Sequence, residues 1–312
     1  MGRDPDYLAF LRTRLAAEPP PGRRTISELR KEHAADLAAL PRPEVGAVKD
    51  VTIDGPGGPL PARLYRPAHP VQAGADDPLP CLVYFHGGGW VLGDVESYDP
   101  VARALTLACG VALLSVDYRR PPENPFPAAV DDAVAAVRWT AANARDHGLD
   151  RARLGVAGDS AGGQIAAAAA WRLRDRHLAP ALQLLVYPAV DLRDVPPDLP
   201  DPDGLTFERS GVDRILTLYL LGTDRTMPEV SPLLAADLTG MPPTIIATAE
   251  HDRLRPQAER YAARLTESGV DVTLLTGTGL DHGFLGWGSF ARRPAEAIAG
   301  IGAAVRAAFA RV

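Results

Sequence analysis

Hydrophobic and polar residues follow two different spacings along this chain. Over residues 1–45 the apolar positions recur at helical intervals, interrupted by prolines and a glycine at 19–22. One or two helices are predicted there, with Thr25 or Ser27 as the cap of the second. From Val48 onward apolar positions alternate with polar ones, which is the spacing of a half-buried strand. The change of spacing marks the start of a different structural unit.

Strand-like and helix-like segments then follow one another to the end of the chain. Two alternating runs, 48–54 and 60–67, flank a Gly-Pro-Gly-Gly turn and predict a hairpin. Continuous apolar runs predict further strands at 81–86, 111–118, 153–159, 182–188, 243–250 and 271–277. Helices are expected at 99–110, 127–148, 161–177, 255–268 and about 293–311. This alternation is typical of the α/β class, with a mostly parallel sheet covered on both faces.

One segment, residues 193–228, interrupts the alternation. It is rich in Pro and Asp and contains a helical pattern with no strand before it. An insertion after a strand lies at the sheet edge where open α/β sheets bind ligands. We therefore expect residues 1–45 and 193–228 to form a helical cap, over a core made of residues 46–192 and 229–312.

Composition limits the classes of function. The chain has 312 residues, of which 46% are hydrophobic, and a formal net charge of −6 without a Lys/Arg-rich block. This argues against binding to nucleic acid and against stable membrane association. Charges throughout the first residues are unlike a secretory signal, so a cytoplasmic location is expected. Cys81 and Cys109 lie in apolar stretches and are expected to be buried thiols.

A candidate nucleophile lies in the sequence VAGDSAGGQIAAA. Here Gly158-x-Ser160-x-Gly162 follows a predicted strand and precedes an Ala-rich helix. This context is typical of a nucleophile elbow, in which a tight turn exposes the serine. The N-terminus of the helix also offers free N–H groups to negative charge at that point. The sequence therefore predicts Ser160 as a catalytic nucleophile.

A nucleophilic serine needs a base and a group that orients the base. Asp252 and His282 follow Ser160 in the order that α/β hydrolases use, and each comes just after a predicted strand. Carboxyl ends of parallel strands meet at one sheet edge, so the three side chains are expected together. Glu250 and Asp281 remain alternative acids.

A second motif is the sequence FHGGGW at 85–90. Three glycines directly after a strand suit either a phosphate cradle or a hole for an oxyanion. No Lys-Ser/Thr follows them and no Gly-x-Gly-x-x-Gly is present, which disfavours the phosphate cradle. Together with an elbow serine, the loop is interpreted as half of an oxyanion hole. Gly87 would let the strand turn sharply, and His86 would brace the loop.

These motifs resemble a known family. HGGGW at 86–90, GDSAGG at 158–163 and the stretch 116–132 are similar to hormone-sensitive-lipase-like carboxylesterases (bacterial family IV), which have the α/β-hydrolase fold. YPAVDL and the HGF that begins at His282 also match, and the resemblance spans roughly residues 48–290.

The resemblance implies roles for individual residues. Ser160 would be the nucleophile, Asp252 the triad acid and His282 the base. The N–H groups of Gly88, Gly89 and Ala161 would form the oxyanion hole, supported by the loop residues His86, Gly87, Gly158, Asp159 and Gly162. Three features depart from the family pattern. Gln164 stands where the family usually has Asn, and Asp281 stands where an apolar residue is usual. From Asp252 onward the sequence is Asp-Arg-Leu-Arg-Pro, whereas the family usually has Asp-Pro-Leu-Arg-Asp.

The expected reaction is hydrolysis of a small-molecule ester through an acyl-enzyme, without a metal or cofactor, because no zinc-type spacing is present. An amidase or lactonase, or a catalytically silent receptor on the same fold, are the alternatives. The absence of a long apolar lid helix favours short to medium acyl chains. Candidate pocket residues are Tyr7, Leu8, Leu11, Trp90, Leu216, Leu218, Tyr219 and Leu220. A homodimer could form through the predicted edge strand 271–277.

Overall fold

A single eight-stranded sheet organises the part of the chain that the computed structural model describes, namely residues 2–17, 24–69, 77–174, 177–197, 201–205 and 211–312. The strands are β1 (Ala47–Gly55), β2 (Gly58–Arg66), β3 (Leu79–Phe85), β4 (Ala112–Val116), β5 (Leu149–Asp159), β6 (Leu182–Val186), β7 (Thr244–Ala249) and β8 (Val272–Gly277). Their order is β1-β2-β4-β3-β5-β6-β7-β8. The hairpin β1–β2 and the β2–β4 pair are antiparallel, and the other neighbours are parallel. The predicted α/β class and hairpin are confirmed.

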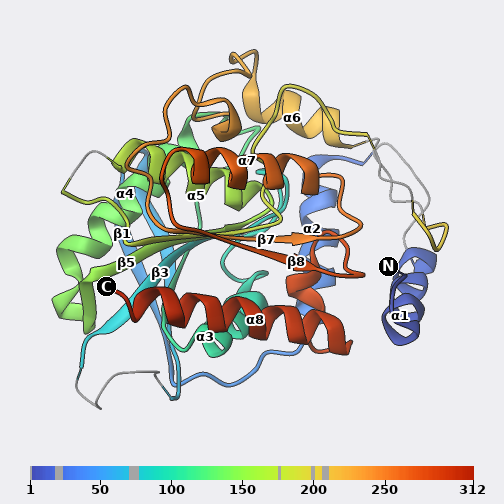
Figure 1. Cartoon of the computed structure of the whole chain (residues 1–312), viewed down its shortest axis with the longest axis horizontal. Helices are drawn as coiled ribbons and strands as arrows, with labels where there is room; N and C mark the ends of the chain where they lie inside the picture. Colours follow the sequence, from blue (N-terminus) through green and yellow to red (C-terminus); the bar gives the residue numbers. More distant parts are fainter. Residues whose placement is uncertain (1, 18–23, 70–76, 175–176, 198–200, 206–210) are drawn as a thin grey trace.

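Helices cover both faces of the sheet (Figure 1). One face carries α3 (Asp99–Cys109) and α8 (Arg292–Phe309), and the other carries α4 (Ala128–Asn143), α5 (Ala161–Leu173) and α7 (Arg255–Glu267). The central strands β3, β4, β6 and β7 are buried along their whole length, because side chains on both faces meet a helical layer. The edge strand β8 alternates between half-buried and exposed positions. The buried apolar residues accordingly form two clusters.

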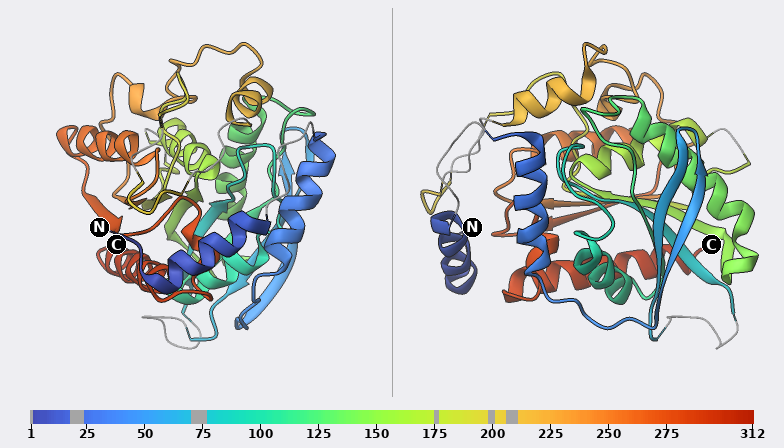
Figure 2. Two further views of the ribbon diagram at one scale, coloured as in Figure 1. Left: turned by 90° about the vertical axis from the view of Figure 1, so that its right-hand side faces the viewer. Right: turned by 180° about the vertical axis from the view of Figure 1, so that it is seen from behind.

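The three remaining α-helices lie outside these layers. Beyond one end of the sheet lie α1 (Pro5–Ala17) and α2 (Ile26–Ala38), while α6 (Val212–Leu220) lies above the α5–α7 layer in Figure 1 and again in Figure 2. Thr25 caps α2 in a capping box with Glu28, as one of the two predicted alternatives requires. The predicted Pro-rich break at 19–22, and parts of the segment 193–228, lie outside the described residues.

Several boundaries differ from the sequence prediction. The helix expected at 127–148 ends at Asn143 and continues as a short 3-10 turn, η1 (Arg145–His147), which Gly148 closes with a left-handed backbone. Strand β5 therefore begins earlier than predicted, at Leu149. Two more 3-10 turns are η2 (Pro232–Leu234) and η3 (Phe284–Trp287).

Both cysteines are buried and free, as expected, and burial raises the pKa of each thiol to about 12. Among the described helices, none combines the length and the apolar character that crossing a membrane requires.

Candidate active site

Ser160 lies in a strained turn between β5 and α5. Its φ of 53° and ψ of −116° are rare for a residue with a side chain. Its N–H donates to the carbonyl of Val186 at 2.9 Å, and its own carbonyl accepts from Ala189 at 3.2 Å. These bonds to the next segment of the chain hold the strained conformation, as the elbow prediction requires.

The glycines of the elbow are explained by close approach of backbones. A Cβ atom at Gly158 would collide with the carbonyl of Gly162, and one at Gly162 would collide with the carbonyl oxygens of Phe85 and His86. Gly163 has the same difficulty with Pro188, at 2.8 Å. The N-terminus of α5 can therefore reach the sheet only because these positions lack side chains.

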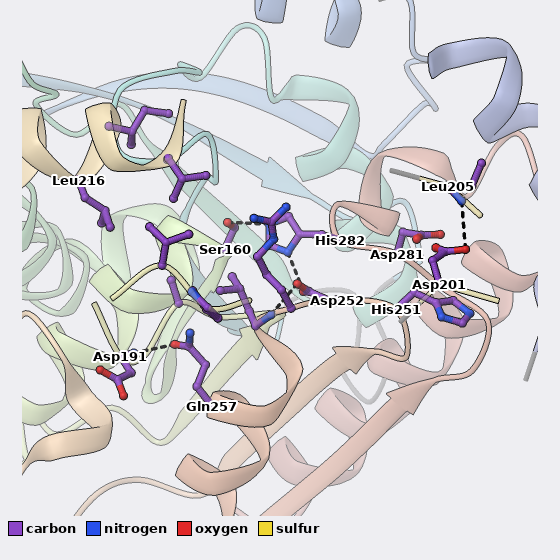
Figure 3. A pocket seen from close by; sticks show the side chains of 18 of the residues that line it. Ser160, Asp191, Asp201, Leu205, Leu216, His251, Asp252, Gln257, Asp281 and His282 are labelled. Atoms are coloured by element: carbon purple, nitrogen blue, oxygen red, sulfur yellow. Dashed lines mark hydrogen bonds and ion pairs between the residues drawn. The ribbon is translucent and has the colours of Figure 1, made fainter. Parts of the chain in front are cut away.

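The three predicted triad residues form a continuous hydrogen-bonded chain (Figure 3). His282 Nε2 lies 2.9 Å from Ser160 Oγ, and His282 Nδ1 lies 2.7 Å from Asp252 Oδ2. The other Asp252 oxygen accepts the N–H of Leu254 at 2.9 Å, which fixes the carboxylate. The alternative acids make other contacts: Glu250 accepts from the N–H of Gly279, and Asp281 pairs with Arg3.

The electrostatic surroundings of His282 suit a general base. Burial favours the neutral imidazole, but the charge of Asp252 and its hydrogen bond outweigh burial and raise the pKa of His282 above its ordinary value. Asp252 is nearly fully buried, whereas 40% of the His282 side chain is exposed toward the pocket. An incoming substrate can thus reach the imidazole while the carboxylate stays shielded.

The glycine-rich loop turns directly after β3. Gly88 and Gly89 have φ values of 99° and 58°, which only glycine adopts readily. The Gly88 carbonyl accepts the N–H groups of Val91 and Leu92, at 3.3 and 2.9 Å, and so closes a tight turn. Among the described residues, the N–H groups of Gly88, Gly89 and Ala161 have no hydrogen-bond acceptor. Such free donors are what a developing oxyanion needs.

Asp159 ties this loop to the elbow. Its carboxylate is buried and accepts hydrogen bonds from the N–H of Gly87 at 2.8 Å, the hydroxyl of Tyr84 at 2.6 Å and the hydroxyl of Tyr187 at 3.4 Å. Burial raises the pKa of Asp159 to about 6, although these bonds oppose the shift. A Cβ at Gly87 would lie 2.5 Å from this carboxylate, so Gly87 permits the contact.

His86 braces the loop from behind. Its ring stacks between Tyr98 and Tyr118, with centroids 4.8 and 4.5 Å away. Its Nδ1 lies 2.8 Å from the carbonyl of Gly87. Burial lowers the pKa of His86 to about 3, so the ring is neutral and supports the loop as a packed group.

A pocket of about 660 Å³ opens above Ser160 and His282. Its apolar and aromatic wall is made by Leu11, Leu15, Trp90, Ala189, Leu192, Val195, Leu205, Val212, Ile215, Leu216, Leu254 and Trp287. In Figure 3, Leu216 and Leu205 lie on opposite sides of the Ser160–His282 pair. Both belong to the segment 193–228, which therefore contributes to two sides of the pocket.

Of the eight predicted pocket residues, Leu11, Trp90 and Leu216 line the pocket. The other five, Tyr7, Leu8, Leu218, Tyr219 and Leu220, are not among its lining residues in the described part of the chain. Tyr219 instead lies beneath the wall: its ring stacks on Trp90 at 4.6 Å, and its hydroxyl donates to Gln164. Tyr7 is fully buried against Trp287. The helical pattern identifies the apolar face of each helix, but it does not show which part of that face packs against protein and which part faces the pocket.

Sequence reasoning missed two supporting residues. Tyr187, just after β6, has a φ of 36° and places its ring 4.7 Å from that of His282. Gln257 on α7 is buried and accepts the N–H groups of Val190 and Asp191, both at 2.6 Å, beside the pocket. The YP at the end of a predicted strand was a signal for Tyr187, whereas nothing local distinguishes Gln257. Among the described residues no group of His, Cys, Asp or Glu side chains could hold a metal ion.

Known proteins similar to this chain in sequence or structure include esterases and other members of the α/β-hydrolase fold. Residues 82–286 match the family model described as the α/β-hydrolase fold. The carboxylesterase NlhH of Mycobacterium tuberculosis is 42% identical over 245 residues, which cover 76% of this chain and 75% of that protein. The ethyl acetate hydrolase of Pseudomonas putida is 35% identical over 274 residues, covering 86% and 85%. The solved structure of a hyperthermophilic esterase from Pyrobaculum calidifontis superposes with a TM-score of 0.87 at 35% identity, covering 98% and 99% of the two chains.

Proposed function

This chain belongs to the hormone-sensitive-lipase-like family of α/β-hydrolase carboxylesterases, and we propose that it hydrolyses short- to medium-chain acyl esters through a covalent serine ester. Its relatives are named as carboxylic ester hydrolases, and this chain is one as well. The observation that carries the finer proposal is the chain of contacts from Ser160 through His282 to Asp252, which opens into the pocket.

In the first half of the reaction, neutral His282 accepts the proton of Ser160 through Nε2 as Oγ attacks the ester carbonyl. Asp252 holds Nδ1–H and stabilises the imidazolium that forms. His282 then donates that proton to the leaving alcohol, and an acyl-serine remains. In the second half, water attacks the acyl carbon while His282 takes a proton from that water. His282 then returns the proton to Ser160 Oγ as the bond between Oγ and the acyl carbon breaks, which regenerates the serine and releases the carboxylic acid product.

The oxyanion of each tetrahedral intermediate would accept from the free N–H groups of Gly88, Gly89 and Ala161. Preorganised donors of this kind are each worth about 2.7–4 kcal/mol in a serine protease. Asp159 and His86 act through the loop, because they fix its backbone without facing the pocket.

A small substrate is supported by the enclosure of the site. The pocket receives residues from helix α1 and from the segment 193–228, so its volume of about 660 Å³ is bounded on several sides. The name of the Pseudomonas relative states a two-carbon acyl ester. These lining contributions also support residues 1–45 and 193–228 as a helical cap over the core of residues 46–192 and 229–312.

Association of two copies through β8 is a further part of the proposal. This strand is an edge of the sheet, and Leu274 on it is 42% exposed. An exposed strand edge with an apolar side chain is a surface suited to pairing. Sedimentation velocity would detect the dimer, and Leu274→Lys should shift it toward monomer.

The activity is tested with p-nitrophenyl esters from acetyl to palmitoyl, with a lactone and an anilide in the same panel. We expect kcat/KM to be highest for acetyl to hexanoyl esters and Ser160→Ala to lose at least a thousandfold in kcat. Full activity in Ser160→Ala, or a preference for palmitoyl esters, would contradict the proposal. Faster turnover of the lactone or the anilide would assign the main activity to the alternative instead.

A further inference from the structure

Arg3 occupies an unusual environment for an arginine near a chain terminus. Its side chain is fully buried and lies among three carboxylates. Nε donates to Asp281 at 2.8 Å, Nη1 and Nη2 donate to Asp201 at 2.9 and 2.6 Å, and Nη1 also reaches Asp203 at 2.9 Å. We call these four residues the Arg3 clamp.

The clamp joins three segments that are far apart in sequence. Arg3 precedes α1, Asp201 and Asp203 belong to the segment 193–228, and Asp281 directly precedes His282. The N–H of Asp281 also donates to the hydroxyl of Tyr7 on α1 at 3.4 Å, so the N-terminal segment holds this loop at two points. The clamp is therefore a direct connection between the catalytic loop and both of its covering segments.

One side of the pocket depends on this connection. Asp201 accepts the N–H groups of Asp203 and Leu205, at 2.8 and 3.3 Å, and so shapes the turn that carries Leu205. Asp201, Leu205 and Asp281 all line the pocket, on the side of His282 away from Leu216 (Figure 3). Whatever fixes Asp201 also fixes this wall.

The physical chemistry of the clamp makes it sensitive to the loss of Arg3. The planar guanidinium can bond two carboxylates through paired donors, which a lysine ammonium cannot do. Without it, three carboxylates would face one another in a largely buried space, and like charges would separate them. Asp201 lies in irregular backbone, whereas Asp281 lies four residues after the end of β8 and next to His282, so Asp201 is the carboxylate that we expect to move away.

We propose that Arg3 is a positioning residue. It holds the Asp201–Leu205 wall against the His282 loop and so determines how tightly the pocket encloses its substrate. The proposal rests on the esterase function proposed above. The clamp makes no contact with the Ser160–His282–Asp252 bonds, so its loss should weaken binding of ground state and transition state alike. Such a change raises KM and leaves kcat nearly unchanged.

The test compares wild type, Arg3→Met, Arg3→Lys and the control Arg292→Met, using p-nitrophenyl butyrate. Arg292 is 69% exposed and also ties a distant element to the N-terminal segment, through Asp4. We expect KM to rise five- to twentyfold in Arg3→Met with kcat within threefold, an intermediate KM in Arg3→Lys, and wild-type values in Arg292→Met. A KM within twofold of wild type in folded Arg3→Met, or a loss confined to kcat, would overturn the proposal.

A second readout does not depend on activity. Limited trypsin digestion, followed by mass spectrometry, should show cleavage within residues 193–228 at least fivefold faster in Arg3→Met than in Arg292→Met; equal rates would count against the clamp. If Arg3→Met cannot be purified folded, Asp203→Asn removes one arm without altering a pocket residue and should raise KM two- to fourfold, and an unchanged KM there would overturn the proposal. Failure of the esterase function would appear separately, as full activity in Ser160→Ala.

Discussion

The sharpest prediction concerns Gly88, whose substitution by alanine should disable the proposed oxyanion hole while leaving the fold in place. The φ of Gly88 is 99°, and an added Cβ would lie 2.5 Å from the carbonyl oxygen of Leu92 and 2.8 Å from its carbon. Leu92 cannot move away freely, because its N–H donates to the Gly88 carbonyl across the same turn at 2.9 Å. The backbone at Gly88 must therefore rotate.

The magnitude follows from what that rotation removes. A side chain at such a φ costs about 1–3 kcal/mol of strain. Rotation relieves it but turns the N–H away from the oxyanion, and one lost donor costs about 2.7–4 kcal/mol of transition-state stabilisation. We expect kcat to fall by about 10²–10³, while KM changes by less than about fivefold, since the uncharged ester carbonyl gains little from the donor.

Steady-state kinetics with p-nitrophenyl butyrate, together with thermal unfolding, check this prediction. Gly58→Ala is a matched control: Gly58 has a φ of 114° in the β1–β2 turn, with no atom within 4 Å of an added Cβ. It should lose stability to a similar degree but keep its kcat. A kcat within threefold of wild type in folded Gly88→Ala would refute the reasoning, and so would an equal loss of kcat in Gly88→Ala and Gly58→Ala.

Two further predictions concern pH. His282 must be neutral to accept the serine proton and its pKa is raised, so kcat/KM should fall on the acid side with a midpoint above 6.5. Asp252→Asn should move this midpoint downward and reduce kcat by about 10³–10⁴. Initial rates from pH 5 to 9 test this, and an unchanged midpoint would speak against the proposed role of Asp252. Folding raises the pKa of Asp159 from 3.8 to about 6, so the folded state holds that proton more tightly. This stabilisation is complete below pH 3.8 and is lost as pH rises through 6. Relative to Asp159→Asn, wild type should therefore lose about 2 kcal/mol of unfolding free energy between pH 4 and 7, measured by urea denaturation; a difference that does not change with pH would contradict the assignment.

The local pattern of this sequence was sufficient to predict every strand of the sheet. Alternation marks the β1–β2 hairpin because one of its faces meets solvent, while continuous apolar runs mark the central strands because both faces are covered. The same logic predicts that Ser160, Asp252 and His282 meet: each follows a parallel strand, and the carboxyl ends of such strands share one edge. Side chains at the ends of parallel strands can therefore be placed together from their positions in the sequence.

The surroundings of these residues were decided only by the packing of distant segments. Periodicity shows that one face of α6 is apolar, but Leu216 meets the pocket while Tyr219, on the same helix, lies beneath Trp90. Nothing near Arg3 in the sequence indicates that it contacts Asp201 and Asp281, some two hundred residues or more away. The sequence by itself therefore determined the sheet, the turn at Ser160 and the meeting of Ser160, His282 and Asp252 at one sheet edge, since these follow from local backbone preferences and strand order. Tertiary structure alone decided the shape of the pocket and the burial of Arg3, because both depend on which side chains fill the space between elements that the chain connects only at long range.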